Sequence, residues 1–242
     1  MKVLIGSARV DERGKYTGGK SGDQKQSVIP DLGGEVSMQN FYIHKKGWNI
    51  IRAISATNAE KIAEAMKNAC NNPNIGYDQG NRLAIIKRGT RSAEKTECDC
   101  SSLVRQCVIE GTGNDPGNFT TSNEVAVLLA SKMFYPAIAY KSGVALYNGD
   151  ILVTKQKGHT VIVVQGQPRV EQKPKSDYEY FPIYTGNSDS IRDALVAIGA
   201  NGSFEARQKI AAANNIEEYK GTAAQNMKLL ALLKSGKLKK PS

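Results

Sequence analysis

The sequence predicts an α+β protein in which helices pack on an antiparallel sheet, followed by a small module of three helices. Three observations carry this prediction. Strand and helix signals alternate up to about residue 187, the segment 149–166 has the pattern of a β-hairpin, and every segment after residue 188 is helical. With 242 residues and 40% apolar content, the chain suits one mid-sized domain and a small one. We place these domains at 1–185 and 186–242.

The first part of the chain, residues 1–55, is expected to be rich in strands. The run KVLIGSARV at 2–10 is strand-like, and EVSMQNFYI and WNIIRAI are expected to pair with each other around the turn HKKG. A helix then begins near Thr57, which forms a capping box with Glu60, and stops before Pro73. Cys70 extends the apolar stripe of this helix and is expected in the core.

A second helix is predicted over residues 99–110, with Gly111 ending it. This places Cys107 on the buried face and Cys100 at the N-terminus. A third helix starts near Thr121, where Glu124 again completes a capping box.

The pattern then changes from helix to strand. GDILVTKQKGHTVIVVQG predicts a hairpin in which His159 opens the second strand, and a last strand is expected within 170–186. After a linker near Asn187, three amphipathic helices are predicted over 188–199, 203–216 and 222–236. Thr222 and Gln225 form a capping box for the last of them.

The formal net charge of +10 and the sequence pI of about 9.4 favour a polyanionic partner such as nucleic acid, anionic lipid or an acidic wall polymer. Nucleic acid is disfavoured because the basic residues are scattered, only 7% of residues are aromatic and no nucleic-acid-binding motif is present. No apolar run approaches the ~18 residues of a membrane span, and VLIG is too short for a signal-peptide core. We therefore predict no stable membrane insertion and a first location in the cytoplasm.

The stretch GKYTGGKSGD at 14–23 satisfies the P-loop pattern G-x-x-x-x-G-K-[ST]. A P-loop needs a buried strand before it and a helix directly after the Lys. The sequence after Lys20 has no helical period and contains Pro30, so we predict a surface loop that binds no nucleotide.

The four cysteines have neither disulfide-framework spacing nor a C-x-x-C pair, so reduced thiols are expected. Together with His44 and His159 they lack the spacing of zinc ligands, and no metal or other cofactor is predicted. Cys100 stands out because a helix N-terminus lowers the pKa of a thiol. A helix-start Cys and a strand-start His are the pair that a thiol hydrolase requires, although a capping thiol and an exposed His are the simpler alternatives.

The segments DCSSLV and GDILV…GHTVIVV resemble the NlpC/P60 and CHAP group of cysteine peptidoglycan hydrolases. SARVDERGKYTGGKSGDQ and IGYDQGNR further resemble phage and prophage endolysins of Gram-positive bacteria within that group. The resemblance covers about residues 3–166. It implies a papain-like fold, with Cys100 as the nucleophile and His159 as the base.

The same resemblance implies roles for neighbouring residues. Asp99 and Ser101 flank the nucleophile where the group lines a pocket for the free amine of the stem peptide. Tyr77 matches an upstream Tyr of the group, although a half-buried loop aromatic is equally compatible. Asp23 and Gln24 are expected at the substrate cleft or the oxyanion site, with a solvated turn as the alternative.

The third catalytic residue of the group is a polar side chain about a dozen positions after the base. Here that position is near Glu171, with Gln165 and Asp23 as alternatives.

The implied activity is hydrolysis of an amide bond in peptidoglycan, as an endopeptidase or an N-acetylmuramoyl-L-alanine amidase. The C-terminal module would bind the cell wall, including its anionic polymers. Such an endolysin would wait in the host cytoplasm for release through a holin. The main alternative is a non-catalytic wall-binding protein with the same fold.

Overall fold

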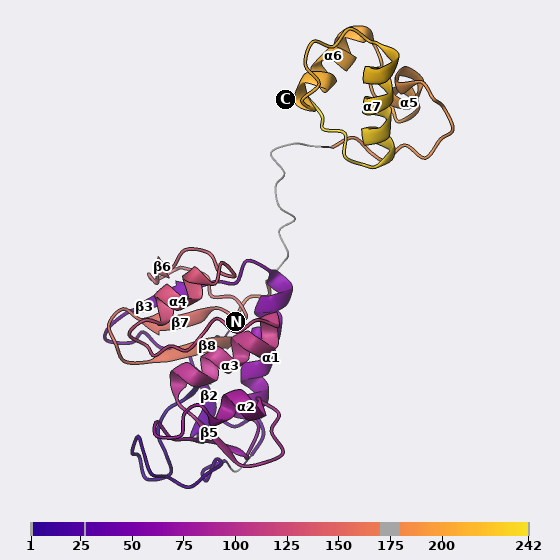
Figure 1. The fold of residues 1–242 in the computed structure, drawn as a ribbon. Helices are drawn as coiled ribbons and strands as arrows, with labels where there is room; N and C mark the ends of the chain where they lie inside the picture. The colour runs from indigo at the N-terminus through magenta and orange to yellow at the C-terminus, as the bar shows by residue number, and fades with distance from the viewer. Residues whose placement is uncertain (1, 27, 170–179, 242) are drawn as a thin grey trace. The chain divides into compact units, whose positions relative to one another are not determined.

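The computed structural model describes residues 2–26, 28–169 and 180–241, and the chain divides into two compact units, residues 1–171 and 172–242 (Figure 1). The first unit combines helices with a six-stranded antiparallel sheet of order β2-β1-β8-β7-β3-β6. This confirms the α+β class. The strands are β1 (Leu4–Ala8), β2 (Val36–Asn40), β3 (Trp48–Ile51), β6 (Ile138–Ala139), β7 (Ile151–Thr154) and β8 (Thr160–Gln165).

The predicted hairpin is present, because β7 and β8 pair antiparallel with Leu152 opposite Val161. The predicted pairing of residues 35–43 with residues 48–54 is wrong. β2 pairs with β1 at one edge of the sheet, whereas β3 pairs with β7 and β6 near the other edge. The short turn between these segments therefore joins non-adjacent strands, which turn residues alone do not reveal.

Two long helices cover one face of the sheet, α1 (Ala56–Cys70) and α3 (Cys100–Thr112) (Figure 1). They pack on each other and on β8. Gly111 lies inside α3, which continues to Thr112, so the prediction that Gly111 ends the helix is wrong. A Cβ at Gly111 would come within 2.4 Å of Ile62 Cγ1 on α1. Gly113, with φ of 76°, caps the helix in the left-handed conformation. The absence of a side chain at Gly111 thus permits the close approach of α1 and α3.

Capping of α1 and α4 differs from the prediction. Ser55 caps α1, where its side chain accepts from the Asn58 N–H, so Thr57 is not the cap. The third helix is α4 (Glu124–Ala130), and Asn123 precedes it without a side-chain cap. Glu124 is its first residue and is fully buried, so it does not complete a capping box.

The two sides of β8 face different cores. Ile162 and Val164 join the core beneath the helices, together with Cys70, Cys98 and Cys107. Val161 and Val163 join a second core around Trp48 on the opposite face. This alternation follows from the two-residue period of a strand. A separate two-stranded parallel sheet, β4 (Ile75–Tyr77) and β5 (Thr96–Cys98), and the short helix α2 (Ala84–Arg88) complete the first unit.

The second unit contains α5 (Ile191–Ala197), α6 (Phe204–Ala213) and α7 (Ala223–Lys234). The predicted capping box of Thr222 and Gln225 is present at the start of α7. A core of its own joins the helices, with Leu195, Ile210 and Leu229 among its buried members. The part of 170–186 that the structure describes forms no strand beyond a single bridge between Tyr180 and Lys239. Among the described residues, no helix has both the length and the apolar character needed to cross a membrane.

Candidate active site

Cys100 is the first residue of α3 and is half-buried, the only one of the four cysteines with partial exposure. Its neighbour Asp99 is the N-cap, accepting from the Ser102 N–H at 2.6 Å while the Ser102 hydroxyl accepts from the Asp99 N–H. This capping box fixes the point at which the helix starts. The predicted start of this helix, with Cys100 at its N-terminus, is confirmed.

Burial, followed by the charges of Asp99 and Glu124, raises the pKa of the Cys100 thiol to about 12. Main-chain N–H groups of Thr160 and Ser101 act in the opposite direction. The expected lowering of this pKa by the helix N-terminus is therefore wrong for the free protein, because desolvation and two carboxylates outweigh the N–H groups. The resting thiol is neutral.

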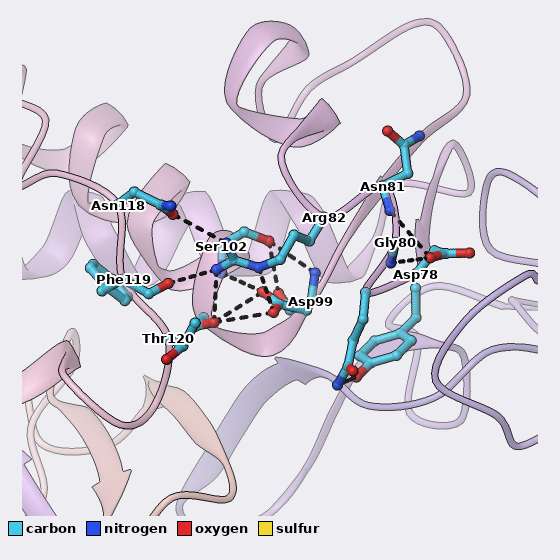
Figure 2. Close-up of polar contacts among 12 residues, drawn as sticks. Asp78, Gly80, Asn81, Arg82, Asp99, Ser102, Asn118, Phe119 and Thr120 are labelled. Atoms are coloured by element: carbon cyan, nitrogen blue, oxygen red, sulfur yellow. Dashed lines mark hydrogen bonds and ion pairs between the residues drawn. The ribbon is translucent and has the colours of Figure 1, made fainter.

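Arg82 holds the segment around Cys100 in place (Figure 2). Its Nε donates to Asp99 Oδ2 at 2.7 Å, and its Nη2 donates to the Ser101 hydroxyl and to the Phe119 carbonyl oxygen at 2.6 Å. Nη1 reaches Asn118. One guanidinium thus ties the start of α3 to the loop before α4. Asp99 and Ser101, predicted to contact substrate, are both engaged within the protein here.

Tyr77 is buried on β4 and is not a loop aromatic. Its hydroxyl accepts from Gln79 Nε2 at 3.0 Å. Burial raises the pKa of Tyr77 above its ordinary value, and the next cause is the charge of Cys100. Tyr77 also lies opposite Cys98 on β5, two residues before Cys100, so β4 borders the segment that carries the thiol.

In the glycine-rich loop at 14–23, main-chain N–H groups donate to carboxylates of the protein itself. The Gly18 N–H donates to Asp78 Oδ2 at 2.6 Å, and the Lys20 N–H donates to Glu12. Asp78 also accepts from Gly80 and Asn81 (Figure 2). The described residues that come directly after Lys20, 21–26 and 28–35, form no helix. The loop therefore lacks the helix N-terminus of a P-loop.

His159 directly precedes β8 and is half-buried. Its main chain is anchored to Thr154, whose hydroxyl accepts from the His159 N–H at 3.1 Å. Burial, followed by the charges of Arg9 and His44, lowers the pKa of His159 to about 4. Within the described residues, no hydrogen bond joins its ring to the Cys100 thiol. Thr160, the residue after His159, connects the two, because its main-chain N–H lowers the pKa of the Cys100 thiol.

His44, the other His of the chain, also belongs to this region, because a positive charge on its ring lowers the pKa of His159. Its ring packs against Trp48 with centroids 5.3 Å apart, and its Nδ1 accepts from the Lys46 N–H at 3.0 Å. This contact leaves Nε2 as the nitrogen that carries the proton in the neutral ring.

Glu124, for which the sequence predicted only a capping role, also belongs to the site. Its Oε1 accepts from the Thr160 hydroxyl at 2.7 Å, while Oε2 is buried without a hydrogen-bond partner among the described residues. Burial raises the pKa of Glu124 to about 8.

Other predicted site residues lie elsewhere. Asp23 is buried and accepts from the main-chain N–H groups of Lys25, Gln26 and Val36. Gln24 is exposed, and its amide donates to the Ser21 and Gly22 carbonyls. Both stabilise their loop, and the contacts described for them do not reach Cys100 or His159. Gln165 is exposed at the far end of β8, and Glu171 lies outside the described residues.

A family model described as an endolysin-like domain matches residues 5–169, more than half of the chain. The chain belongs to the endolysin-like domain family. No curated protein and no solved structure matches it. The matched range contains Cys100, His159 and every side chain described above around them. Membership in this family supports a phage-type lytic function directed at the bacterial cell wall, and hence a peptidoglycan hydrolase in general terms.

Three residues of the endolysin-like domain were missed as site residues. Arg82 lies in the segment IGYDQGNR, which carries the resemblance, but nothing in its spacing indicates a contact with Asp99. His44 and Glu124 come from segments far from Cys100 in sequence. Within the described residues, no group of three or more His, Cys, Asp and Glu side chains is arranged to hold a metal ion.

Proposed function

We propose that this endolysin-like domain is a cysteine peptidoglycan hydrolase with a papain-like fold of the NlpC/P60 or CHAP type, cleaving an amide bond of the stem peptide. The observation that carries the proposal is the position of Cys100. Its sulfur lies at the start of α3, within reach of the N–H of Thr160, the residue next to His159. The other three cysteines are fully buried.

In the proposed reaction, the neutral His159 accepts the thiol proton as the Cys100 sulfur attacks the amide carbonyl. The C–N bond then breaks, the leaving amine takes the proton from the imidazolium, and a thioester remains. A water molecule attacks the thioester, giving one proton to His159, and the acid product leaves as the thiol reforms. Main-chain N–H groups at the start of α3 are suited to stabilise the oxyanion.

The substrate pocket is proposed around Tyr77, Asp99 and Ser101. Tyr77 lies opposite Cys98 on the strand that leads to Cys100, and Arg82 contacts the other two. For the third catalytic position, Glu171 stays a prediction, and His44 is a second candidate because its charge acts on His159. Hydrogen bonding from either side chain would set the His159 tautomer.

The second unit is proposed as the wall-binding part, which would raise the effective concentration of the hydrolase at its substrate. The basic tail KSGKLKK suits anionic wall polymers. We further propose that the protein stays in the host cytoplasm until a holin opens the membrane.

The test is loss of turbidity of purified Gram-positive cell walls, with mass analysis of the released fragments. Cys100→Ala is expected to lose at least ~10³-fold in rate, because no other exposed thiol replaces the nucleophile. Cys98→Ala, a buried neighbour on β5, is the matched control and should keep activity in proportion to its folded fraction. Released amines identify the bond that is cut.

Two results would contradict the proposal. Undiminished lysis by Cys100→Ala would remove the thiol mechanism. Wild-type protein that sediments with walls of several chemotypes but releases no fragment would favour the non-catalytic wall-binding alternative.

A further inference from the structure

Glu124 is a buried carboxyl with only half of its hydrogen-bonding capacity used. It is 0% exposed, Oε1 accepts from the Thr160 hydroxyl, and Oε2 is buried without a hydrogen-bond partner among the described residues. An ionised carboxylate in such surroundings is strongly disfavoured. A purely structural role would be served better by an apolar or amide side chain, so the carboxyl calls for another explanation.

Thr160 connects Glu124 to the nucleophile. Its side chain is fully buried and donates to Glu124, and its main-chain N–H acts on the Cys100 sulfur. It is also the residue next to His159. Through one hydroxyl, Glu124 therefore holds the segment that presents both the N–H group and the base to Cys100.

The groups that act on Glu124 come from the start of α3 and from β8. From α3, the charge of Asp99 disfavours ionisation of Glu124, while Asp99 itself is paired with Arg82 at 2.7 Å. Cys100, the first residue of α3, is affected in turn, because a negative charge on Glu124 raises the pKa of its thiol. From β8, Thr160 contributes a hydroxyl donor. None of the ion pairs formed by the described residues includes Glu124.

We propose that Glu124 is a positioning residue for Cys100: as a neutral carboxylic acid it holds Thr160 against the sulfur, and when ionised it suppresses formation of the Cys100 thiolate. The inference rests on the proposed function, in which Cys100 is the nucleophile. It adds an alkaline limit to that function. The limit arises from Glu124 and not from His159, which is neutral throughout this range.

The test measures the alkylation rate of Cys100 by iodoacetamide in the full-length protein, followed by peptide mass analysis. The thiolate is the reacting form, so the rate reports its population. Cys98 and Cys107 are internal controls, because both are fully buried and react only if the fold opens. This measurement needs no wall cleavage and is therefore independent of whether the proposed reaction is correct.

Glu124→Gln keeps an oxygen for the Thr160 hydroxyl but cannot ionise. We expect the rate ratio of this variant to wild type to be roughly threefold to tenfold higher at about pH 9.5 than at about pH 6.5, since only wild type gains the opposing charge. Wild-type lysis should fall over the same range, and Glu124→Gln lysis should not.

Thr160→Val and Thr160→Ser form a second pair of variants. Val removes the hydroxyl with little change in volume and is expected to lower Cys100 reactivity at least threefold, whereas Ser should restore it. A rate ratio for Glu124→Gln that stays constant with pH, with Cys98 and Cys107 protected, would overturn the proposal. If Cys98 and Cys107 become reactive in Glu124→Gln, the Thr160 variants decide, and equal Cys100 reactivity in Thr160→Val and Thr160→Ser would overturn the proposal.

The two proposals can fail separately. A pH-independent rate ratio for Glu124→Gln, together with loss of lysis in Cys100→Ala, would overturn the positioning role of Glu124 and leave the proposed function intact.

Discussion

At the Cys100 sulfur, the environment disfavours the negative charge that the proposed reaction would develop there. Burial and two carboxylates raise the pKa of the thiol to about 12, and burial with Arg9 and His44 lowers the pKa of His159 to about 4. The free protein therefore holds a neutral thiol and a neutral imidazole. In the proposed reaction, proton transfer from the thiol to His159 must therefore accompany attack on the substrate, because the free protein holds no thiolate–imidazolium pair.

The pH dependence of the reaction should show this directly. His159 has a lowered pKa and so stays unprotonated, and able to act as a base, until the pH falls to about 4. We expect the acid limb of kcat/KM on a soluble muropeptide to have its midpoint near pH 4. Arg9→Gln, which removes the largest positive charge acting on His159, should move the midpoint to higher pH. A midpoint near 6.5 in wild type, unchanged in the variant, would contradict this expectation.

At the scale of elements, the site depends on how the start of α3 is held. Asp99 alone could cap the helix, as its sequence position indicates. Arg82 joins this cap to the loop before α4, because it contacts Asp99, Ser101 and the Phe119 carbonyl together. The close packing of α1 on α3 at Gly111 fixes the other end of the same helix.

Arg82→Gln is therefore expected to be costly. It leaves Asp99 without its cation in a region where both side chains are mostly buried, 16% and 10% exposed. We expect a loss of about 2–4 kcal/mol in the free energy of unfolding and at least ~10²-fold in lytic rate. Urea denaturation and wall turbidity measure the two effects.

The matched control for Arg82→Gln is Arg91→Gln. Arg91 pairs with Glu64 at 2.9 Å, but the two side chains are 72% and 63% exposed. Its loss should change stability by no more than about 0.5 kcal/mol. Equal effects of the two substitutions would show that Arg82 has no special role.

At the scale of the whole molecule, the two units have separate cores. The first is organised by the sheet with α1 and α3, and the second by α5, α6 and α7. Each core is built from residues of its own unit. The catalysis proposed for the first unit and the wall attachment proposed for the second are therefore expected to be separable.

Two fragments test this separation. Residues 1–171 should keep the kcat of full-length protein on a soluble muropeptide, but lose at least ~10-fold in rate on intact walls, because the second contact is missing. Residues 172–242 should sediment with walls and lyse nothing. Equal lysis of intact walls by full-length protein and by residues 1–171 would show that the second unit does not serve attachment.

The sequence by itself determined the α+β class, the β7–β8 hairpin, the start of α3 at Cys100 and the capping box of α7. Each of these depends on a local pattern, such as strand alternation, helical period or a cap three residues from its partner. The tertiary structure alone decided the placement of β2 and β3 apart from each other, the interior role of Gly111, and the surroundings of Cys100. Arg82, Glu124 and His44 act there through contacts between distant segments, and their effects on the pKa values of the site arise from burial. Sequence spacing contains neither the contacts nor the degree of burial, so the charges that govern the nucleophile become visible only when the chain is folded.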